Sequence, residues 1–159
     1  MSIEYQFVPY KSVGEYYFGM KRFEIKSKLG EPFSSYKYGY PVEDRFLDDY
    51  GFFHILCSNK SELEAIELFP DVLTDNVIVL SCDDKIITLN KDVKTTLDEF
   101  KKVTDDFLWH DDEEGYSSVK LGVKIYCPNG YIEDVIIHDL HCYDEEIQYL
   151  NENDVWIVS

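Results

Sequence analysis

The stretch GVKIYCPNGYIEDVIIH, residues Gly122–His138, has the composition of two β-strands joined by a turn. Asn129-Gly130 separates two runs rich in β-branched and aromatic residues. Asn-Gly in that setting is the strongest short-range hairpin signal, because both residues tolerate the positive φ angles that a tight turn needs. The stretch therefore predicts a β-hairpin with a tight turn at Asn129-Gly130.

A similar stretch, GFFHILCSNKSELEAIELF, occurs earlier in the chain at Gly51–Phe69. Cys57 and Cys127 occupy matching positions 70 residues apart, and Leu63 matches Ile132 at a separation of 69. This spacing predicts two copies of one unit, each containing a hairpin of the same kind.

One amphipathic helix is predicted ahead of each hairpin. The first covers Lys21–Leu29, since Ile25 and Leu29 share a helical face. Gly30 is placed to cap its C-terminus in the left-handed conformation, and Pro32 prevents continuation. The second covers residues 92–103, where Asn90 or Asp92 can cap the N-terminus and the apolar stripe is Val93, Leu97 and Phe100.

Polar segments rich in aromatic residues, 33–50 and 104–118, are predicted as exposed connectors between helix and hairpin. Val77–Leu80 and Ile86–Leu89 have strand composition, with a turn at Asp83-Asp84. At the C-terminus we expect a helical turn within residues 143–152 and a short strand at Val155–Val158.

Consecutive strands joined by turns form an antiparallel sheet, and the helices then gather on one face. We therefore predict an α+β fold of two tandem helix-plus-antiparallel-sheet repeats, 1–82 and 83–159, in one compact unit. One helix per three or four strands leaves the other sheet face uncovered. That face is the expected binding surface.

Negative charge dominates the composition: the formal net charge is −17 at pH 7. Residues 1–40 hold six basic and four acidic residues, so the remainder carries −19. Such a surface repels nucleic acid phosphate, whereas its field speeds association with basic proteins. The charge therefore argues against nucleic acid and favours a cationic protein partner, although acidity can also serve solubility alone.

The N-terminus lacks a basic start followed by an apolar core, and no apolar run reaches the roughly 18 residues of a membrane span. We therefore expect a cytoplasmic protein that does not enter a membrane. Its four cysteines contain no CxxC pair and are expected to be reduced and structural: Cys57, Cys82, Cys127 and Cys142.

The acidic segment 104–116 is the first candidate for partner binding. It combines carboxylates, which steer a basic partner, with aromatic rings, which supply contact area at low entropic cost. Its candidate residues are Asp105, Asp106, Trp109, Asp111, Asp112, Glu113, Glu114 and Tyr116. The alternative is a solvated loop with Trp109 turned into the core.

A second candidate is the alternating row Tyr36, Tyr38 and Tyr40, which would line one face of a strand. The alternative is a half-buried strand face without a binding role.

Catalytic and metal motifs are weak. His138, His141 and Cys142 lie close together, but their spacing matches no common zinc pattern. No GxSxG, Walker A, GxGxxG or HExxH string occurs, and Asp111–Glu114 lacks the alternating ligands of a calcium loop. We therefore expect no enzymatic activity, no metal and no cofactor.

One resemblance extends this interpretation. The string FGMKRFEIKSKLGEP carries a Gly-Met, an acidic residue before an aliphatic one, and Leu-Gly-x-Pro, followed later by Glu64-Ala65-Ile66. It resembles the β-lactamase-inhibitory-protein-like group, with Lys21 where Ser or Thr is usual. The matching residues are Gly19, Met20, Glu24, Ile25, Leu29, Gly30 and Pro32.

The opening FVPYKSVGEYYFGM is also similar to bacterial immunity proteins and antitoxins encoded beside polymorphic toxins. The resemblances imply a tandem-repeat inhibitor that occludes a cognate toxin, with a basic nuclease as the expected target. A structural assembly module and a small-ligand-binding module are the alternatives. A deep apolar pocket would favour the small-ligand module.

Overall fold

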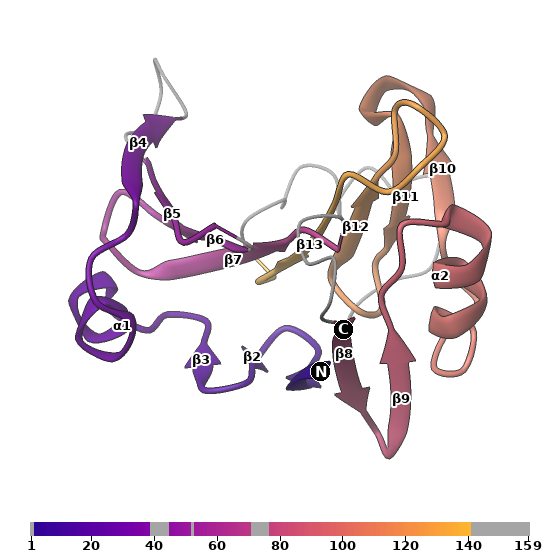
Figure 1. The fold of residues 1–159 in the computed structure, drawn as a ribbon, viewed down its shortest axis with the longest axis horizontal. Helices are drawn as coiled ribbons and strands as arrows, with labels where there is room; N and C mark the ends of the chain where they lie inside the picture. The colour runs from indigo at the N-terminus through magenta and orange to yellow at the C-terminus, as the bar shows by residue number, and fades with distance from the viewer. Residues whose placement is uncertain (1, 39–44, 52, 71–76, 141–159) are drawn as a thin grey trace.

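The computed structural model describes residues 2–38, 45–51, 53–70 and 77–140. These residues form two sheets, two α-helices and one short 3-10 helix, so the fold is mixed α+β as predicted (Figure 1). Tyr40 and the elements expected at 143–152 and Val155–Val158 lie outside the described residues. No helix in the described ranges is long and apolar enough to cross a bilayer.

Eight of the described strands form one antiparallel sheet. In sheet order they are β10 (Leu108–His110), β11 (Gly115–Ser118), β12 (Val123–Tyr126), β13 (Asp134–His138), β7 (Leu63–Leu68), β6 (Phe53–Cys57), β5 (Arg45–Asp49) and β4 (Ser34–Tyr38). The four strands that follow the first helix thus meet the four that follow the second helix at the β7–β13 pair.

The sheet is strongly curved, with β4 at one end and β10 at the other rising on the same side (Figure 1). The helices α1 (Arg22–Leu29) and α2 (Val93–Phe100) lie on the convex side. Among the described elements, no helix or strand packs across the opposite side. We call that side the concave face.

A second sheet of five described strands lies below the convex side, in the order β3 (Tyr16–Tyr17), β2 (Ser12–Val13), β1 (Ser2–Val8), β8 (Val77–Cys82) and β9 (Lys85–Thr88). Strand β1 pairs with β8 in parallel, while β8 and β9 form a hairpin. Its turn has positive φ at both Asp83 and Asp84, which confirms the turn predicted there. The predicted boundary between residues 82 and 83 falls inside this hairpin.

The core fills the space between the convex side and the smaller sheet. Alternate residues of the strands point into it, as a period of two requires. Each fully buried Ile, Leu or Phe contributes about 1.5–3 kcal/mol relative to exposure. Buried members include Phe7, Ile25, Ile55, Ile66, Leu68, Leu80, Phe100, Ile125, Val135 and Ile137.

Both predicted helices are confirmed. Helix α1 ends at Leu29, and Gly30 follows at φ 82°. At its N-terminus Lys21 provides no side-chain cap, and Arg22 instead reaches Asp48 on β5. Helix α2 begins after Asp92, whose carboxylate accepts the Thr95 amide hydrogen bond at 2.9 Å. Helix α2 ends at Phe100, three residues earlier than expected.

The hairpin prediction was right about the strands and wrong about the turn. Strand β12 ends at Tyr126, opposite Asp134, so the connection runs through residues 127–133. Within it Ile132 is buried in the core and its amide donates to the Lys91 carbonyl at 2.8 Å. Burying this side chain favours the longer loop over a two-residue turn at Asn129-Gly130.

The predicted connectors are not loops, because each contains two strands; only the strand expected at the tyrosine row is confirmed, by β4, as far as Tyr38. Residues 33–50 form β4 and β5, and residues 104–118 include β10 and β11. Their polar composition hid the strands, since buried polar side chains in them are satisfied by neighbours. Asp48, for example, accepts hydrogen bonds from Arg22 and from Ser35.

Candidate partner-binding face

A row of polar side chains crosses the centre of the concave face. Asp49, His54, Glu67 and Asp134 come from β5, β6, β7 and β13, which are adjacent strands. Asp49 lies opposite His54, and His54 lies opposite Glu67. The row alternates along its strands with core residues, so the antiparallel pairing places all four side chains on the concave side.

Contacts link the row from end to end. His54 Nε2 lies 3.3 Å from Asp49 Oδ1, and His54 Nδ1 lies 3.5 Å from Glu67 Oε1. Glu67 in turn shares a hydrogen bond with Asp134. The row therefore connects the two halves of the sheet through a contact between two carboxyl groups.

The ionisation of the two carboxyl groups differs in direction. Burial, the hydrogen bond with Glu67 and the charges of Glu67 and Glu133 raise the pKa of Asp134 to about 9. Burial also opposes ionisation of Glu67, but hydrogen bonds from His54 and Asp134 hold its pKa below the ordinary value. At neutral pH Asp134 therefore carries the shared proton and Glu67 the negative charge.

His54 supports that assignment. Burial alone would lower the pKa of its imidazole, yet the hydrogen bond to Glu67 and the charges of Glu67 and Asp49 raise it. The two acidic neighbours therefore favour the charged form of the imidazole. His54 Nδ1 lies at ion-pair distance from Glu67 but makes no hydrogen bond of normal geometry among the described residues.

Asp134 is left with an unmatched oxygen. Its residue is only 8% exposed, and Oδ1 has no hydrogen-bond partner among the described residues. The same side chain lines a hollow of about 380 Å³ on the concave face. An unpaired buried polar atom costs free energy, and here it belongs to a side chain that lines a hollow, so this carboxyl group is a candidate for contact with a ligand.

The walls of this hollow are partly apolar and partly ionic. Tyr126 and Ile136 line one part, and Gly115 contributes no side chain. Lys124 also lines it, with its ammonium 3.1 and 3.0 Å from the two carboxylate oxygens of Glu113. Gly115 is required by close strand packing, because a Cβ there would lie 2.0 Å from the Ile125 carbonyl oxygen.

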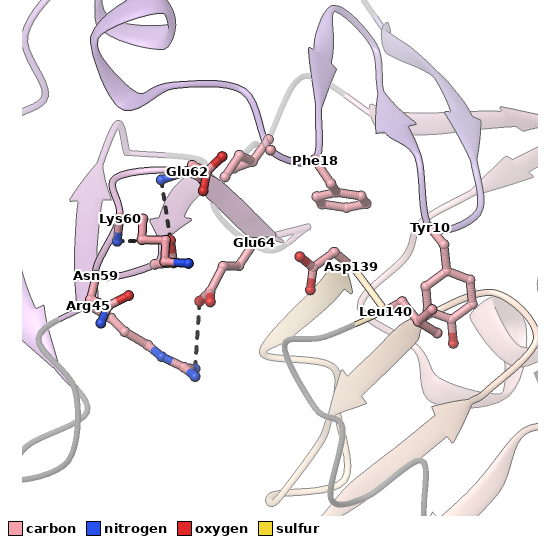
Figure 2. Close-up of a pocket in the computed structure, with 12 residues that line it drawn as sticks. Tyr10, Phe18, Arg45, Asn59, Lys60, Glu62, Glu64, Asp139 and Leu140 are labelled. Atoms are coloured by element: carbon pink, nitrogen blue, oxygen red, sulfur yellow. Dashed lines mark hydrogen bonds and ion pairs between the residues drawn. The ribbon is translucent and has the colours of Figure 1, made fainter.

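A larger hollow, about 590 Å³, lies where the β6–β7 connection meets the end of β13 and the β1–β3 segment (Figure 2). Charged side chains of both signs line it, and Arg45 lies 3.6 Å from Glu64 there. Phe18, Tyr10 and Leu140 supply its apolar part. This mixed lining differs from the deep apolar pocket that a small-ligand module predicts.

The candidate side chains of the acidic segment 104–116 do not form one surface. Trp109 is 47% exposed, stacks edge-on against Tyr116 and donates from Nε1 to Asp111 at 3.2 Å. Its register opposite Tyr116 places it on the convex side, away from the Glu67–Asp134 pair. Tyr116 is half-buried and packs against the core.

The acids of this segment fall into different environments. Asp106 is half-buried and accepts hydrogen bonds from the Ser118 hydroxyl, the Thr104 hydroxyl and the Lys120 amide at 2.6, 2.7 and 2.9 Å. It therefore holds the loop together. The other candidates are exposed, and of these only Glu113 reaches the concave hollow through Lys124: Asp105, Asp111, Asp112, Glu113 and Glu114.

The tyrosine row is brought to the concave face in part. Tyr36 is 57% exposed on β4, and its register opposite Leu47 places it on the concave side at the rim. Tyr38 ends the same strand, and its side chain lies outside the description, as does Tyr40.

Sequence reasoning missed His54, Glu67 and Asp134. A weak signal existed, because His54 and Glu67 are polar residues at outward positions of mainly apolar strands and Asp134 is the polar start of another. Nothing local shows that β7 pairs with β13, and that pairing brings Glu67 and Asp134 together.

Three of the four cysteines are described, and all three are buried and free: Cys57, Cys82 and Cys127. Burial raises the pKa of their thiols, which makes them poor nucleophiles. In the described ranges, no group of three or more His, Cys, Asp or Glu side chains is arranged to hold a metal ion.

Comparison of the chain with models of known protein families, with curated proteins and with solved structures finds no match. The functional interpretation therefore rests on the charges, the curvature of the sheet and the unmatched carboxyl group of the concave face.

Proposed function

We propose that this chain is an immunity protein that binds a basic bacterial toxin domain on its concave face and covers the toxin's active cleft. The observation that carries the proposal is the buried, unmatched carboxyl group of Asp134 beside a hollow on that face. In the free protein such a group costs free energy, because it is buried without a partner. In a complex a cation can pair with it, so the group favours the complex over the free protein.

Charge complementarity supports a cationic partner. The two described basic residues on or beside the acidic row are already matched within the protein, Arg45 by Glu64 and Lys124 by Glu113. The carboxyl groups of Glu67 and Asp134 face each other instead. With a net charge of −17, the chain attracts a basic protein and repels phosphate.

A tandem duplication is part of this proposal. The β6–β7 register pairs Ile55 with Ile66, and the β12–β13 register pairs Ile125 with Val135. These pairs are related by the same separations, 70 and 69, that the sequence repeat predicts. In this proposal β8 is the counterpart of β1, so the second repeat includes β8 and begins no later than Val77, whereas the predicted boundary lay between residues 82 and 83.

A concave sheet face suits occlusion. A curved sheet contacts a convex domain over several strands at once, which is how an interface reaches the roughly 800 Å² per partner of a stable complex. Half-buried apolar groups such as Ile136 and exposed rings such as Tyr126 and Tyr36 can supply desolvated contacts around the acidic centre.

Co-expression tests this function. Each reading frame adjacent to the gene is expressed alone and then together with this chain, and cell survival is measured. We expect one neighbour to be basic and lethal alone, and this chain to restore growth and co-purify with it as a complex. Amide hydrogen exchange of the complex should show protection on β6, β7, β12 and β13.

Two results would count against the proposal. One is that no neighbouring product is toxic. The other is rescue by a complex whose protected amides lie on α1, α2 or the five-stranded sheet, which would move the interface away from the concave face. As a control, the variant Asp98→Asn removes one carboxylate from α2 and should rescue growth like the unmodified chain.

A further inference from the structure

The carboxyl groups of Glu67 and Asp134 meet at the seam between the two halves of the eight-stranded sheet. Glu67 lies on β7 and Asp134 on β13, and these strands pair directly. Two carboxylates in hydrogen-bond contact cannot both stay ionised, so the pair holds one proton and one negative charge. The seam therefore carries a polar group whose charge can change when a ligand binds.

Among the described residues, titratable and charged groups approach the pair from every adjacent strand. They are His54 on β6, with Asp49 of β5 behind it, Lys124 and Tyr126 on β12, Glu113 on the 3-10 helix Asp111–Glu113, and Glu133 and His138 along the β13 segment. His54 binds the far side of Glu67, and Lys124 is held by Glu113. Neither contact satisfies Oδ1 of Asp134.

We propose that Asp134, together with the hollow that it lines and its carboxyl partner Glu67, forms a binding site for one guanidinium group, an arginine side chain of the partner, which displaces the shared proton. Guanidinium presents parallel N–H donors in a planar fork and is weakly hydrated, so it suits two adjacent carboxyl oxygens better than ammonium does. The source of the arginine rests on the proposed function, whereas the chemistry of the site does not.

The hollow supplies contacts for the rest of such a side chain. Tyr126 and Ile136 line it beside Asp134, and Tyr126 is 38% exposed. A guanidinium within about 6 Å of an aromatic ring gains cation–π attraction, and the methylene stem of arginine packs on apolar walls. The site thus combines the carboxyl group of Asp134 with the apolar surfaces of Tyr126 and Ile136, while Lys124 in the same wall is held by Glu113.

Binding of a cation at this site should release a proton, so its affinity should depend on pH. The guanidinium keeps its own proton at all relevant pH values, and the O–H proton of Asp134 leaves to solvent as the cation arrives. One proton is released for each cation bound. Affinity therefore rises about tenfold per pH unit while the pH is below the pKa of the free carboxyl group, and levels off above it.

The test uses N-acetylargininamide, whose only charge is the guanidinium, with carbon-labelled protein. The carboxyl carbon of Asp134 is followed by NMR during titration at pH 6, 7 and 8 and constant ionic strength. We expect a saturable shift with a dissociation constant on the order of millimolar at pH 8, about tenfold weaker at pH 7. N-acetylcitrullinamide, its uncharged analogue, should cause no saturable shift.

Variants assign the effect to the pair. Asp134→Asn and Glu67→Gln, followed through the Tyr126 ring signals, should each lose binding, while Asp98→Asn on α2 should keep it. The site proposal is overturned if the unmodified protein shows no saturable shift at pH 8, if Asp134→Asn binds equally well, or if the affinity does not change with pH. Because the probe is not a toxin, this result is independent of whether a toxic neighbour is found.

Discussion

Asp48 and Asp134 are two buried aspartates of the same sheet, and they differ in the groups that surround their carboxyl groups. Asp48, on the convex side, is 1% exposed and accepts hydrogen bonds from Arg22 at 2.8 and 2.6 Å and from Ser35 at 2.7 Å. Asp134, on the concave side, faces the carboxylate of Glu67 and has an oxygen without a partner among the described residues. Burial is similar, so the partners make the difference.

The pKa values move accordingly. Burial alone would raise the pKa of Asp48, but the hydrogen bonds from Arg22 and Ser35 and the charge of Arg22 outweigh it and lower the pKa. For Asp134, burial and Glu67 act together and raise the pKa. Asp48 therefore stabilises the fold above its unfolded-state pKa and loses that effect in acid, whereas Asp134 favours the fold most below that pKa.

The comparison separates a carboxyl group that holds the fold from one that costs stability. Proteins tolerate unsatisfied or strained groups mainly where function requires them. Asp48 fixes α1 against β5, and nothing more is needed to account for it. Asp134 has no comparable structural role, which supports its assignment to partner binding.

The largest expected effect is at Asp48. Replacing Asp48 with Ala leaves Arg22 beside the sheet without its partner, and breaking such a pair should lower the free energy of unfolding by about 3 kcal/mol. Urea denaturation at pH 7 measures this. A loss below about 1 kcal/mol, the range of an exposed pair, would show that the two aspartates do not differ as described.

Asp134→Asn should raise the free energy of unfolding, whereas Asp48→Ala lowers it. Between pH 4 and 9 the folded protein keeps a proton on Asp134 that the unfolded chain has released, so stability of the unmodified protein falls as pH rises. Asparagine does not titrate, and the variant should be more stable at pH 8 by about 1–3 kcal/mol, with a smaller gain at pH 5. Urea denaturation of both proteins at pH 5 and pH 8 measures this. A variant that is less stable than the unmodified protein at pH 8 would contradict the prediction.

The smallest expected effect lies in the exposed acids. Asp111, Asp112 and Glu114 lie outside the row, so replacing all three with Ser should slow association with a basic partner a few-fold and weaken its salt dependence, with little change in dissociation. Stopped-flow kinetics at two salt concentrations measures this. Glu113 is kept because it holds Lys124. A large change in dissociation rate would place this loop inside the interface.

Local sequence signals predicted much of the fold. The apolar stripe of α2 and its Asp92 cap, and the Gly30 stop after α1, follow from the periodicity and capping of single helices. The strands on either side of Asn129-Gly130 were also found. The turn between them was not, because the burial of Ile132 is a tertiary effect that outweighs the local Asn-Gly preference.

The site itself required the three-dimensional structure. Glu67 reads in the sequence as an ordinary outward residue of an alternating strand, and Asp134 as the polar start of another. Only the non-local β7–β13 pairing makes them neighbours. The acid-rich segment 104–116 drew attention by composition, yet Asp106 within it turns inward to bind Ser118 and Thr104.

The most direct test of this account is the ionisation of Asp134 in the free protein. The carboxyl carbon shift of Asp134 is recorded by NMR from pH 3 to 10, with Asp98 as an exposed reference. We predict that the Asp134 carboxyl group stays protonated through neutral pH and titrates near pH 9. A midpoint near 4 for Asp134 would mean that the carboxyl group is already ionised, and would contradict the assignment of the concave face as a site kept ready for a cation.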